Sequence, residues 1–568
     1  MKLLLWMMLS FLVAWVTFLQ KVSALDNGLA LTPPMGISTW SVFRGNVNHS
    51  LILELTDSIV RLGLHHVGYE YVLVDAGWTT NKKNCKMCLP NRDSNGNLVI
   101  DERKFPNLTE TIDYVHSKGI KFGLWFGVEM CATTNDESEG SPAKRTNSSS
   151  SSRSMLRKQN AKVVDYATLD AQLFASLRVD AIKHDSCGIE VTNTSKALRA
   201  NFAKYEAMSR ALNQTGRPIL YDVTLQVDKP IRTLPAYDYK YIWSPEPYGQ
   251  ANVQRIANMW WSVPVNKYNC WSCCVHPNEY IVPKEYCNSP HHVAAWRGLL
   301  PMIDIQDMGI PGWMGHWDWA GRGKGWNHLD QLGICIGPSW YGPGLSPVEQ
   351  YTQVSLWAIL ASPMIISVDV RNMTSTKAQV DFGNQDAVHH GDDFCYHLIA
   401  NEQLIAVHQD PLGLPGRRLK NNYNHYHNDG NDYGGMGRPP AAAQENGEKT
   451  IETQLWGRPL KDGSVAVVFF NRAETERTIS ATFEEIGLSS SLSLSSKEKQ
   501  SQLKTTVRTT NVWTGISNGG ISSPLIARSV PPHGVIFLIV TPEKEAEPRQ
   551  GNIPIFNSTT TNTFSTSQ

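Results

Sequence analysis

Three aspartates stand at or near the ends of short β-rich apolar runs in the first half of the chain: Asp75, Asp185 and Asp222. Carboxylates that are brought together can act as a nucleophile, as a general acid or base, or as acceptors for ligand hydroxyls. A single aspartate after a strand more simply caps the next helix. Three of them, with tryptophans in neighbouring segments, indicate a site.

The runs that carry these aspartates alternate with helix-like segments from residue 30 to about 415. Continuous apolar character is typical of strands buried on both faces of a parallel sheet. The pattern predicts a (β/α)₈ TIM barrel, whose active face lies at the C-terminal ends of its strands. A doubly wound nucleotide-binding sheet is less favoured because no Gly-x-Gly-x-x-Gly follows the early strands. Barrel strands are predicted at 71–75, 121–126, 181–185, 219–223 and 364–370, and helices at 109–118 and 196–212.

The rest of the chain divides by composition. After the barrel, apolar runs at 453–456, 465–470, 478–483 and 534–540 predict an antiparallel β-sandwich. A Ser-rich stretch at 136–157 and a Thr-, Ser- and Asn-rich C-terminus lack core residues and are expected to be disordered. The predicted organisation is a signal peptide at 1–24, a barrel at 25–416, a linker at 417–449, a sandwich at 450–541 and a tail at 542–568.

The first 24 residues have the features of a secretory signal. Lys2 precedes an apolar stretch, and Val22-Ser23-Ala24 forms a small-residue cleavage site. A membrane anchor is the alternative, because the apolar stretch is near the lower spanning length, but the cleavage site favours a signal peptide. We therefore expect a secreted glycoprotein. Seven Asn-x-Ser/Thr sequons agree with this, at Asn48, Asn107, Asn147, Asn193, Asn213, Asn372 and Asn557.

The composition limits the partners. Lys and Arg together number 52, as do Asp and Glu, so nothing indicates binding to nucleic acid or to an anionic membrane. The 18 tryptophans suit a neutral ligand such as a sugar. Ten cysteines in an exported chain favour disulfides over metal ligation. The irregular spacing of Cys270, Cys273, Cys274 and Cys287 argues against zinc. Neither a metal nor a cofactor is expected.

Several motifs resemble one known family. They lie at Leu25–Gly36, Phe105-Pro106, Val115–Gly119, Asp170–Ala175, Gln353–Ile359 and His408–Gly413. In this order they resemble glycoside hydrolase family 27, chiefly α-galactosidases and α-N-acetylgalactosaminidases. The cysteine-rich insertion and the linker look most like those of fungal α-galactosidases. The resemblance covers residues 25–416, and the sandwich more weakly, and it implies a retaining glycosidase.

The segment Ile182–Cys187 is similar to the family's nucleophile motif at the end of strand four. The resemblance implies that Asp185 attacks the anomeric carbon and forms a covalent glycosyl-enzyme intermediate. Lys183 lies on the same face of the strand, where it can donate to sugar hydroxyls. The resemblance also implies a disulfide between Cys187 and Cys131.

The segment Asp75-Ala76-Gly77-Trp78 is similar to the family's Asp-Asp-Cys-Trp after strand two. By that match Asp75 accepts two sugar hydroxyls. Ala76 removes a second sugar-binding carboxylate, and Gly77 removes a disulfide cysteine whose usual partner is also absent. Trp40 and Trp125 stand where the family places aromatics around the sugar.

The main departure follows strand six, where the family has Trp-Arg and then the aspartate that acts as general acid and base. Here Trp261 replaces the arginine, and Val265 or Pro264 replaces the aspartate. The later Trp-Asn-Asp-x-Asp survives only in part, as Trp326–Asp330. The sequence does not choose among the candidate substitutes, which are Asp222, Glu246, Asp304, Asp307 and Asp318.

Three interpretations follow. The chain is an α-galactosidase-type hydrolase that releases terminal α-galactose with a relocated acid, a family enzyme with shifted sugar specificity, or a secreted carbohydrate-binding protein without turnover. We favour the hydrolase, with a small carbohydrate as its substrate. The sequence does not determine the oligomeric state.

Overall fold

The computed structural model describes residues 25, 27–80, 91–127, 165–185, 195–224, 256–261, 296–306, 320–337, 344–374, 392–425, 449–488 and 506–543. Several predictions lie outside these residues. They concern the signal peptide at 1–24, the Ser-rich stretch at 136–157, all but the first residues of the tail, the sequons at Asn147, Asn193 and Asn557, and the cysteines Cys131, Cys187, Cys270, Cys273, Cys274 and Cys287.

Eight parallel strands form the first sheet, in the order β7-β6-β5-β4-β3-β2-β1-β8. Its two ends meet through a parallel bridge between Leu332, which follows β7, and Ile366 of β8. This confirms the predicted TIM barrel. The strands are β1 (Met35–Ser38), β2 (Tyr71–Val74), β3 (Lys121–Gly127), β4 (Ala181–Asp185), β5 (Leu220–Thr224), β6 (Met259–Trp261), β7 (Trp326–His328) and β8 (Met364–Ile366).

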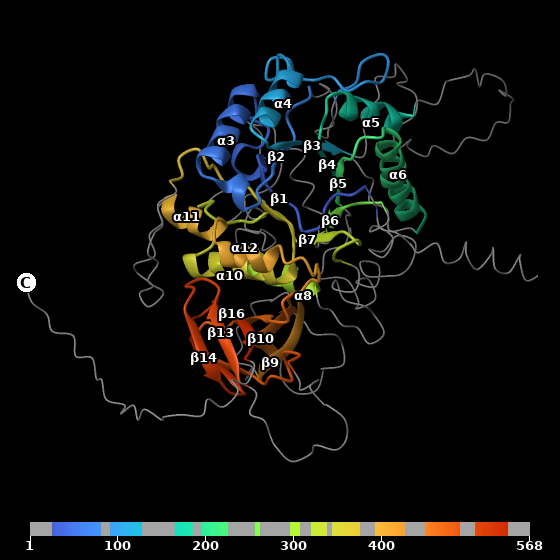
Figure 1. Ribbon diagram of the computed structural model, residues 1–568. Coiled ribbons are helices and arrows are strands. Elements are labelled where there is room, and N and C mark those ends of the chain that lie inside the picture. Colours follow the sequence, from blue (N-terminus) through green and yellow to red (C-terminus); the bar gives the residue numbers. More distant parts are fainter. Residues whose placement is uncertain are drawn as a thin grey trace, which may run out of the picture.

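Helices surround these strands (Figure 1). Local sequence signals start several of them: Asn107 caps α4 by accepting from the Glu110 amide, and Ser346 forms a capping box with Glu349 at the start of α10. The helices are α2 (Trp40–Phe43), α3 (His49–Arg61), η1 (Leu64–Val67), α4 (Leu108–Ser117), α5 (Tyr166–Ser176), α6 (Ser195–Gln214), α8 (Trp296–Ile305), α10 (Pro347–Leu360), α11 (Asp392–Ile399) and α12 (Glu402–His408).

The inside of the barrel changes from apolar to polar along its strands. A small core near the strand starts contains Tyr71, Ala181, Leu220, Met259 and Trp326. Because side chains two residues apart share one face of a strand, the next inward positions on these same strands lie nearer the C-terminal end. They include Lys183 on β4 and Asp222 on β5, which are register partners. Strand alternation therefore places the polar residues near the C-terminal ends of the strands, inside the barrel.

The second domain is antiparallel. A six-stranded sheet in the order β14-β13-β16-β11-β10-β9 faces a two-stranded sheet of β12 and β15. This agrees with the predicted sandwich. Its strands are β9 (Arg417–His425), β10 (Lys449–Pro459), β11 (Val465–Asn471), β12 (Arg477–Ala481), β13 (Val507–Asn511), β14 (Ser517–Ile521), β15 (Leu525–Val530) and β16 (Val535–Pro542).

Helices α10 and α12 lie between the barrel strands and the six-stranded sheet (Figure 1). The central strand β11 is buried on both faces. Its residues Val467 and Phe469 pack within the sandwich, whereas Val468 and Phe470 share a core with α10. Residues 350–360 of α10 are all buried because this helix packs between the barrel strands and the six-stranded sheet. The two domains therefore share one continuous apolar interface.

One prediction about domain limits needs correction. Residues 417–449 were expected to be a linker, but Arg417–His425 is strand β9, which pairs with β10 at the edge of the sandwich. The sequence signal was weak because Arg, Lys and Asn dominate this strand. Such residues are common on edge strands, where charged side chains discourage pairing with other chains.

His533 joins the two domains through charge and stacking. Its ring stacks on Trp296 at 4.2 Å between centroids, and its Nδ1 lies 2.8 Å from the Glu349 carboxylate of α10. A second carboxylate, that of Glu474, lies 3.2 Å from Nε2. Burial alone would lower the pKa of His533, but the two carboxylates outweigh it and raise that pKa. Burial would raise the pKa of Glu349, but hydrogen bonds from His533 and Ser346 lower it.

These opposite shifts predict a pH window for the contact. The raised histidine pKa adds stability that is full below about pH 6.5 and is lost as the pH rises further. The lowered glutamate pKa adds stability that is full above about pH 4.5 and is lost as the pH falls. We expect His533→Asn, which tolerates the left-handed φ of 57° here, to cost about 1 kcal/mol of unfolding free energy near pH 5.5 and less at pH 8. Urea unfolding at both pH values measures this, and a pH-independent loss would contradict it.

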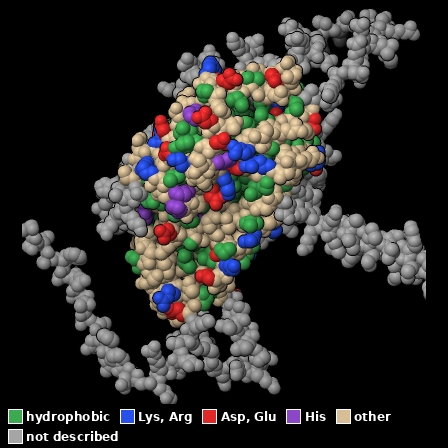
Figure 2. Space-filling view, turned by 45° about the horizontal axis from the view of Figure 1, so that its top comes forward, with side chains coloured by type: hydrophobic (Ala, Val, Ile, Leu, Met, Phe, Trp, Pro, Cys, Tyr) green, Lys and Arg blue, Asp and Glu red, His purple; other side chains and the backbone are tan. Residues whose placement is uncertain are grey.

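The surface agrees with the balanced composition. Basic and acidic side chains are interspersed over the described part of the face in Figure 2. The sequon asparagines Asn48, Asn107, Asn213 and Asn372 are all exposed. Within the described ranges, no helix combines the length and apolar character needed to cross a bilayer.

Candidate active site

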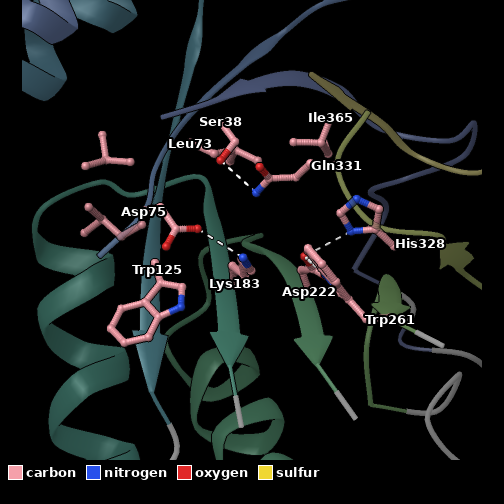
Figure 3. A pocket seen from close by; sticks show the side chains of 12 residues that line it. Ser38, Leu73, Asp75, Trp125, Lys183, Asp222, Trp261, His328, Gln331 and Ile365 are labelled. Carbon is pink, nitrogen blue, oxygen red and sulfur yellow. Dashed lines mark hydrogen bonds and ion pairs between the residues drawn. The ribbon is translucent and has the colours of Figure 1, made fainter. Parts of the chain in front are cut away.

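A small cavity opens inside the C-terminal half of the barrel. Asp75 lies on one side of it, Asp222 and His328 on the other, and Lys183 between them (Figure 3). Polar groups thus gather on an otherwise apolar wall. The lining residues are Ser38, Leu73, Val74, Asp75, Leu124, Trp125, Lys183, Asp222, Trp261, His328, Gln331 and Ile365.

Asp75 and Lys183 form a buried ion pair, with 3.0 Å between Lys183 Nζ and Asp75 Oδ2. Burial raises the pKa of Asp75, although Lys183 and the Ala76 amide act against this. Burial by itself would lower the pKa of Lys183, but the carboxylates of Asp75, Asp185 and Asp222 together raise it. The ammonium group is therefore held charged among three carboxylates, where it can donate to a ligand hydroxyl.

Asp185 ends β4 beside this pair. Its Oδ2 accepts a 3.0 Å hydrogen bond from the indole Nε1 of Trp125, and only 7% of the residue is exposed. Trp125 itself lines the cavity. The pairing of β3 with β4 brings the two residues together, because Trp125 pairs with Lys183 and Gly127 with Asp185. An aspartate fixed in this way presents its other oxygen in one orientation, as a nucleophile requires.

A second polar group occupies the opposite wall. Trp261 Nε1 donates to Asp222 Oδ2 at 2.8 Å, and His328 Nδ1 lies 3.5 Å from the same oxygen. That last distance is within ion-pair range but is too long for a good hydrogen bond. The Trp261 ring packs edge-on against His328 at 4.3 Å and lies under the Lys183 ammonium at 4.5 Å. Trp261 thus connects the two walls.

Asp330 follows this group, in the loop after β7. Its backbone is left-handed, with φ at 86°. Burial raises the pKa of Asp330 to about 6, and the nearby Asp185 charge adds to the rise, while Gln331, His328 and Lys183 act against it. A carboxyl group in this state is a possible proton donor, although Asp330 does not line the cavity.

The five carboxylates that the sequence offers as candidate acids differ in position. Asp222 lines the cavity. Asp304 on α8 instead pairs with Arg472 of the sandwich at 2.6 Å, so its carboxylate serves the domain interface. Glu246, Asp307 and Asp318 lie outside the described residues, as do Pro264 and Val265.

Of the two tryptophans predicted to surround the sugar, only one lines the cavity. Trp125 lines the cavity, whereas Trp40 begins α2 directly after β1, is buried, and is not among the lining residues. The lining residues that the sequence did not predict include His328 and the pair Ser38 and Gln331, which hydrogen-bond to each other at 3.0 Å. The position of Ser38 next to Thr39 at the end of an apolar run was the available signal.

A lysine holds together two loops at this end of the barrel. The ammonium group of Lys104 donates to the carbonyls of Gly45 and Gly77, at 2.7 and 3.0 Å. Gly77 has φ at 111°, and a Cβ there would lie 2.6 Å from the Gly45 oxygen. Only glycine therefore permits this close approach of the two backbones. The lysine thus connects the loop after β1 to the loop that carries Asp75.

We expect Lys104→Met to destabilise the protein by about 1–3 kcal/mol, because two partly buried carbonyls lose a charged donor. Lys104→Arg, which keeps a cation, is the matched control and loses less. Urea unfolding followed by fluorescence measures the difference. Equal losses in the two variants would show that the charge at this position is unimportant.

A disulfide that the sequence did not reveal joins Cys335, after β7, to Cys395 of α11. The predicted Cys131–Cys187 pair stays a prediction, since both cysteines lie outside the described residues. Over the described residues, no group of histidine, cysteine and carboxylate side chains is arranged to hold a metal ion.

Comparisons with known proteins identify relatives of this arrangement. A family model described as alpha galactosidase A matches residues 32–142, 159–281 and 295–391, and one described as the alpha galactosidase C-terminal beta sandwich domain matches 450–540. Alpha-galactosidase 1 of Saccharomyces cerevisiae is 27% identical over 91% of this chain and 86% of its own length.

Solved structures agree on the fold. Alpha-galactosidase I from Mortierella vinacea superposes with a TM-score of 0.58 at 23% identity, covering 91% of this chain and 98% of its own. An α-galactosidase from Saccharomyces cerevisiae, solved with raffinose, superposes with a TM-score of 0.56 at 24% identity. The match covers 92% of this chain and 100% of that one.

Proposed function

Since the chain belongs to the α-galactosidase family, glycoside hydrolase family 27, we propose that it is a retaining α-galactosidase. It releases terminal α-linked galactose from oligosaccharides or glycoconjugates. The observation that carries the proposal is the cavity lined by Trp125 and the Asp75–Lys183 ion pair, with Asp185 held beside it by the Trp125 indole.

In this proposal the cavity binds the galactose ring. Asp75 accepts hydrogen bonds from sugar hydroxyls, and Lys183 donates one. The hydroxyls thus exchange their hydrogen bonds to water for hydrogen bonds to fixed protein groups. Trp125 and the apolar residues Leu73 and Ile365 face its C–H groups. A preformed arrangement of this kind loses little entropy on binding.

Asp185 then attacks the anomeric carbon. A bond forms between a carboxylate oxygen of Asp185 and that carbon while the bond to the leaving oxygen breaks, giving a β-linked glycosyl-enzyme. The Trp125 indole keeps the carboxylate oriented, and Lys183 offsets its charge. Water later displaces Asp185 and restores the α configuration. Each step requires a proton donor or acceptor opposite Asp185.

The test combines turnover with trapping. The purified protein is assayed on nitrophenyl α-galactoside and on raffinose, with nitrophenyl β-galactoside as the control for anomeric specificity. It is then incubated with an activated fluorinated galactoside and digested for mass spectrometry. We expect hydrolysis of the α-anomer only, and a label on the peptide that contains Asp185. A protein that binds galactose without turnover or label would instead be a carbohydrate-binding protein.

We also propose export with cleavage after Ala24 and glycans on the exposed sequons. The support is the signal pattern of residues 1–24 together with the exposure of Asn48, Asn107, Asn213 and Asn372. N-terminal sequencing of protein from the medium of a eukaryotic host, before and after removal of N-glycans, tests both statements.

A further inference from the structure

We propose that His328 is the general acid and base of this chain, and that Asp222 positions its imidazole ring. The inference rests on the proposed glycosidase activity and supplies the proton donor that neither Val265 nor Pro264 can provide. It assigns the role to a histidine at a position where the family motif has an aspartate.

The barrel places His328 in the cavity wall and the proposed nucleophile at the end of a different strand. Asp185 lies on β4 and His328 on β7, with β5 and β6 between them in the sheet. His328 pairs in register with Trp261, which pairs with Thr224 at the end of β5. Asp185 likewise ends β4. By this register the two residues stand at a similar level on different strands of the barrel. The glycosidic bond would lie between them, with the nucleophile and the acid on its opposite faces.

Unpaired polar atoms at this wall indicate that it is built for a ligand. His328 is 1% exposed and Asp222 is 3% exposed. In the part of the chain that the structure describes, neither His328 ring nitrogen nor Asp222 Oδ1 has a hydrogen-bond partner. Leaving buried polar groups without partners destabilises the folded protein. Both residues line the cavity, so a sugar oxygen entering it would satisfy them.

The groups that surround the His328 ring are of the kind expected around a residue that transfers protons. The Asp222 carboxylate on β5 lies 3.5 Å from Nδ1, so this edge of the ring is turned toward Asp222. The Trp261 indole on β6 fixes the ring edge-on and also holds Asp222. The further charges are Lys183 on β4, which lies over Trp261, and Asp330 in the loop after β7. Nε2 remains for the substrate.

The proposed steps balance. In the first, Nε2–H of protonated His328 gives its proton to the glycosidic oxygen as the C1–O bond breaks and the Asp185 oxygen bonds to C1. The aglycone leaves as an alcohol, and His328 is neutral. In the second, a water oxygen bonds to C1 while neutral His328 takes the water proton and the Asp185–C1 bond breaks. The product is α-galactose, and both residues return to their starting states.

The decisive experiment compares leaving groups. Loss of a general acid slows poor leaving groups far more than good ones, because a dinitrophenolate departs without a proton. For His328→Asn we expect kcat/KM on raffinose to fall by roughly 10²- to 10⁴-fold. We expect kcat/KM on a dinitrophenyl α-galactoside to change by less than about tenfold, with a burst of dinitrophenolate because the second step has lost its base. The exposed His66→Asn is the control for a surface histidine.

Azide provides a readout that a structural role would not produce. It needs no base, so it should speed the second step in His328→Asn and yield α-galactosyl azide. His328→Asp, which restores a protonatable carboxyl group, should recover part of the raffinose activity. Asp222→Asn should lower kcat on raffinose more than on the dinitrophenyl substrate, since it acts through His328.

The outcomes separate the two proposals. If the wild type hydrolyses neither substrate and Asp185 takes no label, the glycosidase proposal fails and this one with it. If the wild type is active but His328→Asn loses equally on both substrates and gives no azide product, only the assignment of His328 is overturned. The assignment of His328 is also overturned if Asp330→Asn, and not His328→Asn, shows the leaving-group dependence, the burst and the azide product.

Discussion

Asp185→Asn is expected to lower kcat/KM on an α-galactoside by roughly 10⁴- to 10⁶-fold, because an amide oxygen does not form the covalent intermediate. The substitution keeps the size of the side chain, and its oxygen can still accept from Trp125 Nε1. Sugar binding through Asp75 and Lys183 should therefore survive. Steady-state kinetics give the rate, and protection by galactose against thermal unfolding reports on binding.

The control for this prediction is Asp57→Asn, at an exposed aspartate that pairs with Lys118 on the outside of the barrel. It should leave the kinetics unchanged. A smaller variant, Asp185→Gly, makes room for azide, which should then give β-galactosyl azide by direct displacement. That product has the opposite configuration to the one expected from His328→Asn. Full activity in Asp185→Asn would refute the nucleophile assignment and the function built on it.

Arg92→Met is expected to destabilise the protein by about 3–5 kcal/mol. Arg92 and Asp170 form a two-pronged ion pair, with nitrogen–oxygen distances of 2.6 and 2.8 Å and side chains only 1% and 2% exposed. The pair holds the 91–100 segment after β2 against α5. Removing the guanidinium group leaves a buried carboxylate without its partner.

The pH dependence of this loss follows from Asp170. Burial raises the pKa of Asp170 to about 6, even though Arg92 acts against the rise. A raised aspartate pKa means that ionisation in the folded state costs stability, so the penalty is greatest above pH 6 and shrinks as the carboxyl group becomes protonated. The deficit of Arg92→Met relative to wild type should therefore be smaller at pH 5 than at pH 8.

A double variant provides the control for this pair. Arg92→Met with Asp170→Leu removes both charges, and it should recover most of the lost stability because an apolar pair carries no desolvation cost. Urea unfolding at pH 5 and pH 8 measures all three proteins. A loss in Arg92→Met of less than about 1 kcal/mol would place the pair among those that contribute little.

Much of the fold could be predicted from the sequence because its signals are local. Buried parallel strands such as 121–127 have continuous apolar runs, and the predicted helices at 109–118 and 196–212 correspond to α4 and α6. The short strands β1, β6 and β7 were missed, since three or four residues carry little pattern. Strand β9 was taken for a linker because its polar residues suit an edge.

For the site, the sequence by itself determined the grouping of Lys183 with Asp185, the proposed nucleophile, on one strand, and the position of Asp75 after strand two. These depend on residue types within a few positions of each other, and strand alternation places them on one face. Only the tertiary structure decided which other groups meet them. The pairing of β5, β6 and β7 brings Asp222, Trp261 and His328 together, and α8 carries Asp304 away to Arg472. Such contacts join distant segments through sheet register and barrel closure, and no local pattern encodes them.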